Sequence, residues 1–102
     1  MDVVEPFMAL VIYPTTADAQ ERQAGNLMRA VADQVRLLPG FLRARVLVSE
    51  DGNSLVTFTE WTDRESFQQF RASEFGRAAV ALTAGLHPKS YWLHQHAAVE
   101  AP

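Results

Sequence analysis

The chain of 102 residues is long enough for one domain, which we expect to span residues 1–102 with about 6–98 structured. Its formal net charge of −3 argues against nucleic acid as the main partner, because a phosphate footprint needs a basic patch. The lack of cysteine excludes disulfides, thiol nucleophiles and thiolate metal sites. The longest apolar run, residues 7–13, is too short to cross a bilayer, so we expect a cytoplasmic protein without a membrane span.

The first half of the chain begins with a strand and a helix. Residues 6–14 form a short apolar run, rich in β-branched residues, which is typical of a buried strand. Asp18 and Glu21 have the spacing of a capping box and predict the start of a helix of roughly twenty residues. Pro39-Gly40 predicts its end.

A β-hairpin is the next predicted element. Residues 41–50 and 53–61 read as two strands, and Asp51-Gly52 between them is a strong signal for a type I′ turn. In the first of these strands Leu42, Ala44, Val46 and Val48 share one face, and Phe41, Arg43, Arg45 and Leu47 share the other.

Two short helices and a last strand complete the chain. Thr62 and Glu65 form a second capping box, and Ser73 predicts the start of another helix. Gly85 fits the position after that helix, and residues 89–99 read as the final strand.

The resulting order is βαββαβ, which predicts a ferredoxin-like α+β fold with one four-stranded antiparallel sheet and helices on one face. The sheet face away from the helices is also expected to be apolar, with Leu42, Val46 and Val48 on it. A sheet this small cannot leave such a face in water. Either a loop or a second copy must cover it, and of the two we expect a homodimer in which two sheets pack face to face.

The strand at 53–61 carries the strongest hint of a ligand site. Thr57 and Thr59 share a face with Trp61, and they would form the floor of a cavity beneath the helices. Its aromatic walls would be Trp61, Phe67, Phe70 and Phe75. The simpler interpretation is that the two threonines are strand formers whose hydroxyl groups bond locally.

Two further side chains have a possible chemical role. The indole N–H of Trp61 needs an acceptor if it is buried, so it can donate to a bound oxygen, although a tryptophan here can equally be a core residue. Arg77 can hold an anionic or phenolate oxygen at the cavity mouth, although it can also be a solvated helix residue.

The three histidines are the remaining candidates. His94 and His96 share a strand face, but two ligands without a third make a poor metal site, and we predict none. We place His87 and His94 among the residues that contact substrate, where a histidine can act as a general base. No phosphate loop or dinucleotide fingerprint is present, so the sequence supports no nucleotide, flavin or haem cofactor.

Residues 38–70, "LPGFLRARVLVSEDGNSLVTFTEWTDRESFQQF", resemble the antibiotic biosynthesis monooxygenase family. The shared features are a "PGF" strand start, an "S-x-DG" hairpin, a strand that ends in tryptophan, and "x-D-x-E-x-F" at a helix start. The later "RASEF" helix and "P-K-x-Y" strand start fit as well. The resemblance implies a ferredoxin-like monomer that dimerises into an α+β barrel.

The resemblance also implies an activity, namely oxidation of anthrone-type phenols to quinones by O₂ without metal, flavin or haem. The tryptophan of these polyketide oxygenases is matched by Trp61, and an arginine on their later helix by Arg77. Their asparagine and tyrosine are replaced by Thr57 and Phe67. The haem-degrading branch would need tryptophan and histidine where this chain has Phe70 and Val80, which speaks against that branch.

We therefore predict a cofactor-independent monooxygenase that acts on an aromatic polyketide or similar phenol. Trp61, Thr57 and Arg77 would be the catalytic residues, and O₂ the co-substrate. A polyketide cyclase or isomerase on the same scaffold is the alternative enzyme. A dimeric module that binds a small molecule without turnover is the third reading.

Overall fold

The computed structural model describes residues 6–102, and the expected untethered start at residues 1–5 lies outside them. The chain follows the predicted βαββαβ order, with the second helix split in two. The elements are β1 (Phe7–Pro14), α1 (Ala17–Asp33), a 3₁₀ turn η1 (Val35–Leu37), β2 (Phe41–Val48), β3 (Ser54–Trp61), α2 (Arg64–Ala72), α3 (Glu74–Thr83), a 3₁₀ turn η2 (Ala84–Leu86) and β4 (Lys89–Leu93).

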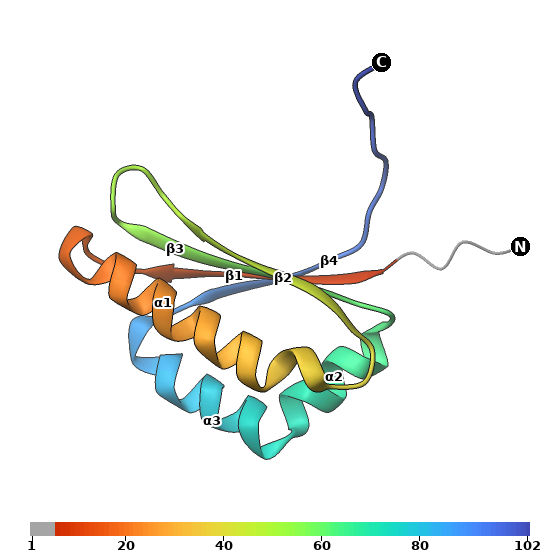
Figure 1. The fold of residues 1–102 in the computed structure, drawn as a ribbon, viewed down its shortest axis with the longest axis horizontal. Coiled ribbons are helices and arrows are strands. Elements are labelled where there is room, and N and C mark those ends of the chain that lie inside the picture. Colours follow the sequence, from red (N-terminus) through yellow and green to blue (C-terminus); the bar gives the residue numbers. More distant parts are fainter. Residues whose placement is uncertain (1–5) are drawn as a thin grey trace, which may run out of the picture.

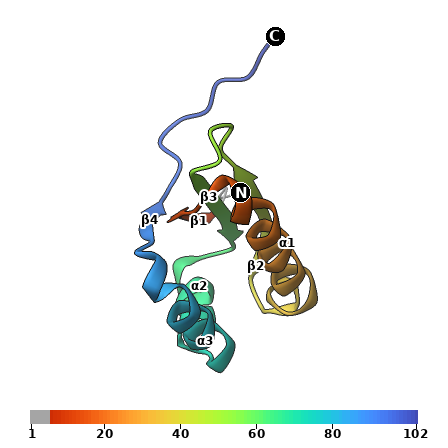
Figure 2. The same cartoon turned by 90° about the vertical axis from the view of Figure 1, so that its left-hand side faces the viewer.

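The four strands form one antiparallel sheet in the order β2-β3-β1-β4, which confirms the ferredoxin-like fold. All three α-helices cover one side of the sheet, and the other side carries none (Figure 1). Residues 94–102 form no regular structure and leave the domain on the side away from the helices (Figures 1 and 2). Within residues 6–102, no helix has the length and apolar character needed to cross a membrane.

Helix α1 begins two residues before the predicted capping box. Thr16 is its N-cap, in an extended conformation, and the Thr16 hydroxyl oxygen accepts a hydrogen bond from the Ala19 N–H at 3.3 Å. Asp18 therefore lies in the first turn, where a carboxylate favours the positive end of the helix dipole. The helix ends at Asp33, and the remaining turn of the predicted length is the 3₁₀ turn η1.

The hairpin between β2 and β3 is confirmed, but its predicted type I′ turn is wrong. Gly52 has a φ of 79°, whereas Asp51 is not in the left-handed region. The Asp51 carboxylate instead accepts hydrogen bonds from the Ser49 hydroxyl at 2.6 Å and the Asn53 N–H at 2.9 Å. These local bonds stabilise a five-residue loop, residues 49–53, in place of a two-residue turn.

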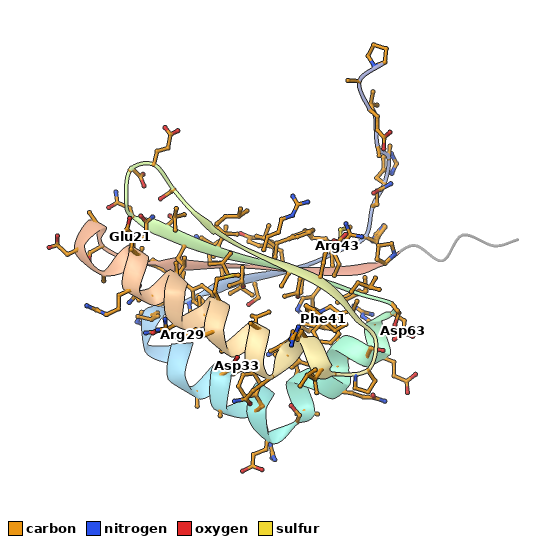
Figure 3. The ribbon with its side chains drawn as sticks, viewed as in Figure 1. Glu21, Arg29, Asp33, Phe41, Arg43 and Asp63 are labelled. Atoms are coloured by element: carbon orange, nitrogen blue, oxygen red, sulfur yellow. The ribbon has the colours of Figure 1, made fainter. Side chains whose placement is uncertain are left out.

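A β-bulge near the start of β2 changes which side chains face the helices. Phe41 pairs with Trp61 and Arg43 pairs with Glu60, so Leu42 is an extra residue between them. Phe41 therefore lies between the sheet and the helices, while Arg43 lies on the opposite side (Figure 3). The predicted grouping of Phe41 with Arg43 fails because simple alternation does not survive the inserted residue.

The outer face of the sheet is apolar, but the residues predicted to make it so were wrong. Val46 and Val48 pair with Thr57 and Leu55 and so lie on the helix side, because residues opposite one another in a ladder share a face. The apolar outer face is formed instead by residues of all four strands: Met8, Leu10, Ile12, Leu47, Val56, Phe58, Tyr91 and Leu93.

The second half of the chain differs from prediction at its boundaries. Helix α2 is capped by Asp63, not Thr62, since the Asp63 carboxylate accepts from the Ser66 N–H at 2.8 Å. Ser73 starts α3 as predicted, and its hydroxyl accepts from the Gly76 N–H at 3.0 Å. The positive φ after α3 falls on His87, at 53°, and not on Gly85. Strand β4 ends at Leu93, six residues before the predicted end.

Candidate functional site

A cavity of about 390 Å³ lies between the helices and the sheet. This volume is within the usual range for small-molecule sites. Strands β1, β3 and β4 form its floor, and the helices form its walls. Its lining residues are Ala9, Val11, Tyr13, Leu27, Ala30, Val31, Val35, Thr57, Thr59, Phe67, Phe70, Arg71, Phe75, Gly76, Ala79, Val80, Pro88, Ser90 and Trp92.

Four hydroxyl groups give this apolar cavity a polar floor. Thr57 and Thr59 project from β3 as predicted, and Tyr13 and Ser90 are added by the neighbouring strands. Burial raises the pKa of Tyr13, and a hydrogen bond with Thr57 offsets part of that rise. Tyr13 is therefore a neutral phenol at neutral pH and can donate a hydrogen bond.

Trp61 lies behind the cavity and is not among its lining residues. The side chain is 0% exposed, and its Nε1–H donates to the Thr59 hydroxyl oxygen at 3.0 Å. The acceptor that a buried indole requires is thus a residue of the same strand face. Since an indole is a donor only, the Thr59 oxygen must accept, and its own hydrogen points elsewhere.

The three predicted phenylalanines do line the cavity. Phe67 and Phe70 project from α2, and Phe75 from α3. Trp61 stacks on Phe70 with ring centroids 5.3 Å apart, and it meets Phe67 edge-on at 5.9 Å. These two rings therefore separate Trp61 from the cavity. The phenylalanines that line the cavity pack on Trp61 behind them.

The structure brings a different arginine to the cavity from the one predicted. Arg77 is exposed and is not among the lining residues. Arg71 lines the cavity from the last turn of α2, with its guanidinium 5.3 Å from the centre of the Trp92 ring. The family pattern pointed to the later helix, whereas the arginine that lines the cavity lies in the last turn of α2.

Sequence reasoning also missed Tyr13, Ser90 and Trp92. Each shares a strand face with recognised lining residues, because Ala9 pairs with both Thr59 and Trp92, and Val11 pairs with Ser90. The available signal was alternation along the first and last strands. Alternation alone does not show which set of alternate residues faces the helices; that requires the pairing register of the strands.

The histidines lie away from the cavity. His87 and His94 are exposed, and neither is a lining residue. His94 and His96 follow the end of β4 and so do not share a strand face. In the part of the chain that the structure describes, histidine and acidic side chains do not gather in threes as a metal site would need. Of the lining residues, Tyr13 and Arg71 carry the titratable groups.

Comparison with known proteins identifies the family. The model of the family described as antibiotic biosynthesis monooxygenase matches residues 7–82, which include the helical lining residues and the β1 and β3 parts of the cavity floor. The chain belongs to the antibiotic biosynthesis monooxygenase family. The matched span ends before β4, so Ser90 and Trp92 lie outside it.

Individual members of the family give the same picture. Over 66 residues, 65% of this chain, the sequence is 24% identical to tetracenomycin-F1 monooxygenase of Streptomyces glaucescens; the match spans 59% of that enzyme's length. A monooxygenase from the gene ActVA-Orf6 of Streptomyces coelicolor, solved with nanaomycin D, has a TM-score of 0.82 and 23% identity, with 99% of this chain and 96% of that chain covered.

A second solved structure is SnoaB, a cofactor-independent oxygenase from Streptomyces nogalater. It has a TM-score of 0.69 and 24% identity, with 98% of this chain and 99% of that chain covered. At these identities the two solved structures establish a shared fold over nearly the whole chain. The family model over residues 7–82 confirms the resemblance to the antibiotic biosynthesis monooxygenases.

Proposed function

We propose that this member of the family is a cofactor-independent monooxygenase that oxidises an aromatic polyketide, or a similar phenol or anthrone, to a quinone with O₂. The observation that carries the proposal is the cavity, which combines aromatic and aliphatic walls with a floor of hydroxyl groups. Such a cavity suits a flat apolar molecule with a few oxygen atoms. The named relatives include oxygenases of this kind, which supports the same reading.

The proposed reaction balances without a further reductant. The ionised phenol or anthrone supplies two electrons to O₂ and forms a carbon–oxygen bond to a peroxide. Loss of water from that peroxide breaks the O–O bond and leaves the new carbonyl. One oxygen atom of O₂ therefore enters the quinone, and the other leaves as water. The protein's task is to bind the ionised substrate, exclude bulk water and stabilise developing negative charge on oxygen.

Thr59 is the donor that the geometry favours for this charge. Its oxygen accepts from Trp61, so its hydroxyl hydrogen is available to an oxygen atom in the cavity. We assign Trp61 the role of a positioning residue that acts through Thr59. Thr57 and Tyr13 supply further hydroxyl groups on the same floor.

The residues that line the cavity indicate where the substrate loses its proton. Neither an imidazole nor a carboxylate is among the described lining residues, and the raised pKa of Tyr13 makes it a poor proton acceptor near neutrality. We expect the enzyme to bind substrate that has already ionised in solution. The rate should therefore rise with pH up to the pKa of each substrate, and the midpoint should move when a more acidic phenol is used. A common midpoint near pH 6.5 for all substrates would indicate a histidine base instead.

Turnover can be measured with purified, metal-free protein and an anthrone under air, by quinone absorbance and O₂ uptake in equal amounts. Thr59→Val should lower the turnover rate by about 100- to 1000-fold, as expected for loss of one donor to an oxyanion. Thr59→Ser keeps the hydroxyl and should recover most of the rate. Turnover that persists without O₂ would favour the cyclase or isomerase. Saturable binding with no product would favour the binding module.

We also propose that the active form is a homodimer joined through the outer sheet faces. Leu47 is 48% exposed on that apolar face, on the edge strand β2 and beside Val56. A second copy would remove this surface from water. Leu47→Glu should convert the dimer to a monomer in sedimentation experiments. Leu37→Glu is the matched control, because Leu37 is 72% exposed on the 3₁₀ turn η1 and away from the sheet. A wild-type mass of one chain at micromolar concentration would refute the dimer.

A further inference from the structure

The opening of the cavity carries a concentration of positive charge. Arg71 and Trp92 line the cavity and are exposed, as are Val80 and Ser90, so the cavity opens to solvent along these residues, whereas Thr57 and Thr59 at the floor are partly buried. A second guanidinium, that of Arg64, lies 5.8 Å from the centre of the Trp92 ring. Two cations thus gather at one indole at the cavity mouth.

These two guanidinium groups have no ion-pair partner among residues 6–102. Within residues 6–102, the ion pair that forms joins Arg43 to Glu60 on the outer side of the sheet. Neither Arg64 nor Arg71 donates a hydrogen bond to a described protein acceptor. Stacking on Trp92 uses the flat face of a guanidinium and leaves its N–H donors at the edge available.

The surroundings make this charge a local feature. The whole chain is acidic, with a net charge of −3, so general attraction of anions is not expected. No acidic side chain lines the cavity among the described residues, and Arg71 is the cationic lining residue. An anionic group of a ligand at the mouth would lie near both Arg64 and Arg71. It would reduce the repulsion between their two positive charges.

We propose that the substrate is a polycyclic aromatic compound with a carboxylate, held at the mouth by Arg71 with help from Arg64. This deepens the function proposed above, and it places the charged end of the molecule at the opening and the ring to be oxidised at the hydroxyl floor. The carboxylate would set orientation as well as affinity, because a planar guanidinium can bind it through two parallel hydrogen bonds.

The test uses ligands that cannot turn over. Anthraquinone-2-carboxylate and anthraquinone-2-carboxamide have the same shape and differ in charge, and both are already oxidised. Binding is measured by equilibrium dialysis under nitrogen. We expect the wild type to bind the carboxylate roughly tenfold more tightly than the amide, and we expect added salt to reduce this preference. Equal binding of the two ligands would overturn the proposal.

Variants then assign the preference to the mouth. Arg71→Met should reduce it to less than about twofold while changing amide binding little, since both ligands lose the same packing. Arg71→Lys should keep part of the preference, because the charge remains while the two parallel hydrogen bonds of the guanidinium are lost. Arg64→Met should have a smaller effect, and Arg36→Met, on the exposed 3₁₀ turn η1, should have none. A preference that survives in Arg71→Met, or is lost equally in Arg71→Lys, would overturn the proposal.

The outcome is separable from that of the proposed function. Equal binding of the carboxylate and the amide by the wild type, with O₂-dependent turnover of an anthrone, would refute the carboxylate and leave the monooxygenase standing. A charge preference without turnover of any anthrone would refute the monooxygenase and leave an acidic aromatic ligand for the same cavity.

Discussion

Replacing Thr59 by valine tests the bond that fixes the cavity floor. The change keeps the shape of the side chain but removes the acceptor of the Trp61 Nε1–H, which is 3.0 Å away in a side chain with 0% exposure. A buried donor left without a partner costs about 1–3 kcal/mol of unfolding free energy. Thr57→Val is the comparison, since it removes a hydroxyl from the same face of β3; its partner Tyr13 lines the open cavity, whereas the Trp61 indole is fully buried.

The two halves of the bond can be separated with a double-mutant cycle. Trp61→Phe removes the donor, so a further Thr59→Val change leaves no unpaired indole behind. The double variant should be more stable than the sum of the two single effects predicts, by about 0.5–1.5 kcal/mol. Urea unfolding at one fixed protein concentration gives each free energy. Single effects that add within about 0.3 kcal/mol, or equal losses in Thr57→Val and Thr59→Val, would refute the argument.

Three further predictions concern the frame around the cavity. A Cβ on Gly76 would lie 2.0 Å from the Phe70 carbonyl oxygen, so Gly76→Ala should lower the unfolding free energy by about 1–3 kcal/mol, whereas Gly25→Ala, with no atom nearer than 3.7 Å, should raise it slightly. Gln20 donates to two hairpin carbonyls at 2.9 and 3.0 Å, so Gln20→Leu should cost about 1–2 kcal/mol in the same assay. The pKa of Asp63 is lowered by hydrogen bonds at the start of α2, so its stabilisation is present above the unfolded-state pKa and is lost in acid. Between about pH 5 and 3 the wild type should therefore lose more stability than Asp63→Ala, and parallel curves would contradict this.

Local signals in the sequence were sufficient for the order of the elements. The β-branched run of β1, the Pro39-Gly40 stop and Ser73 each act through neighbouring residues, so no tertiary information was needed. The boundary errors arose where two candidate caps lie close together. Thr62 and Asp63 both suit the N-cap of α2, and the choice fell to Asp63 because the Thr62 N–H is bound to the Gly40 carbonyl at 2.7 Å.

The site was predictable where it depends on one strand and its following helix. Thr57, Thr59 and the three phenylalanines reach the cavity because alternation in β3 and helical spacing in α2 and α3 act over short distances. The predicted position of Arg77 at the cavity mouth was wrong, because the orientation of α3 depends on the turn at Ser73 and on close packing at Gly76.

The sequence by itself determined the family, the βαββαβ order and the identity of the β3 face that carries the threonines. Tertiary structure alone decided which distant residues complete the site. Tyr13 and Trp92 join it through a strand register that no local pattern specifies, and Arg71 lies at its mouth because the last turn of α2 meets Trp92 of β4. It also decided that the Trp61 indole binds Thr59 and not a ligand, since that depends on which rings close over it.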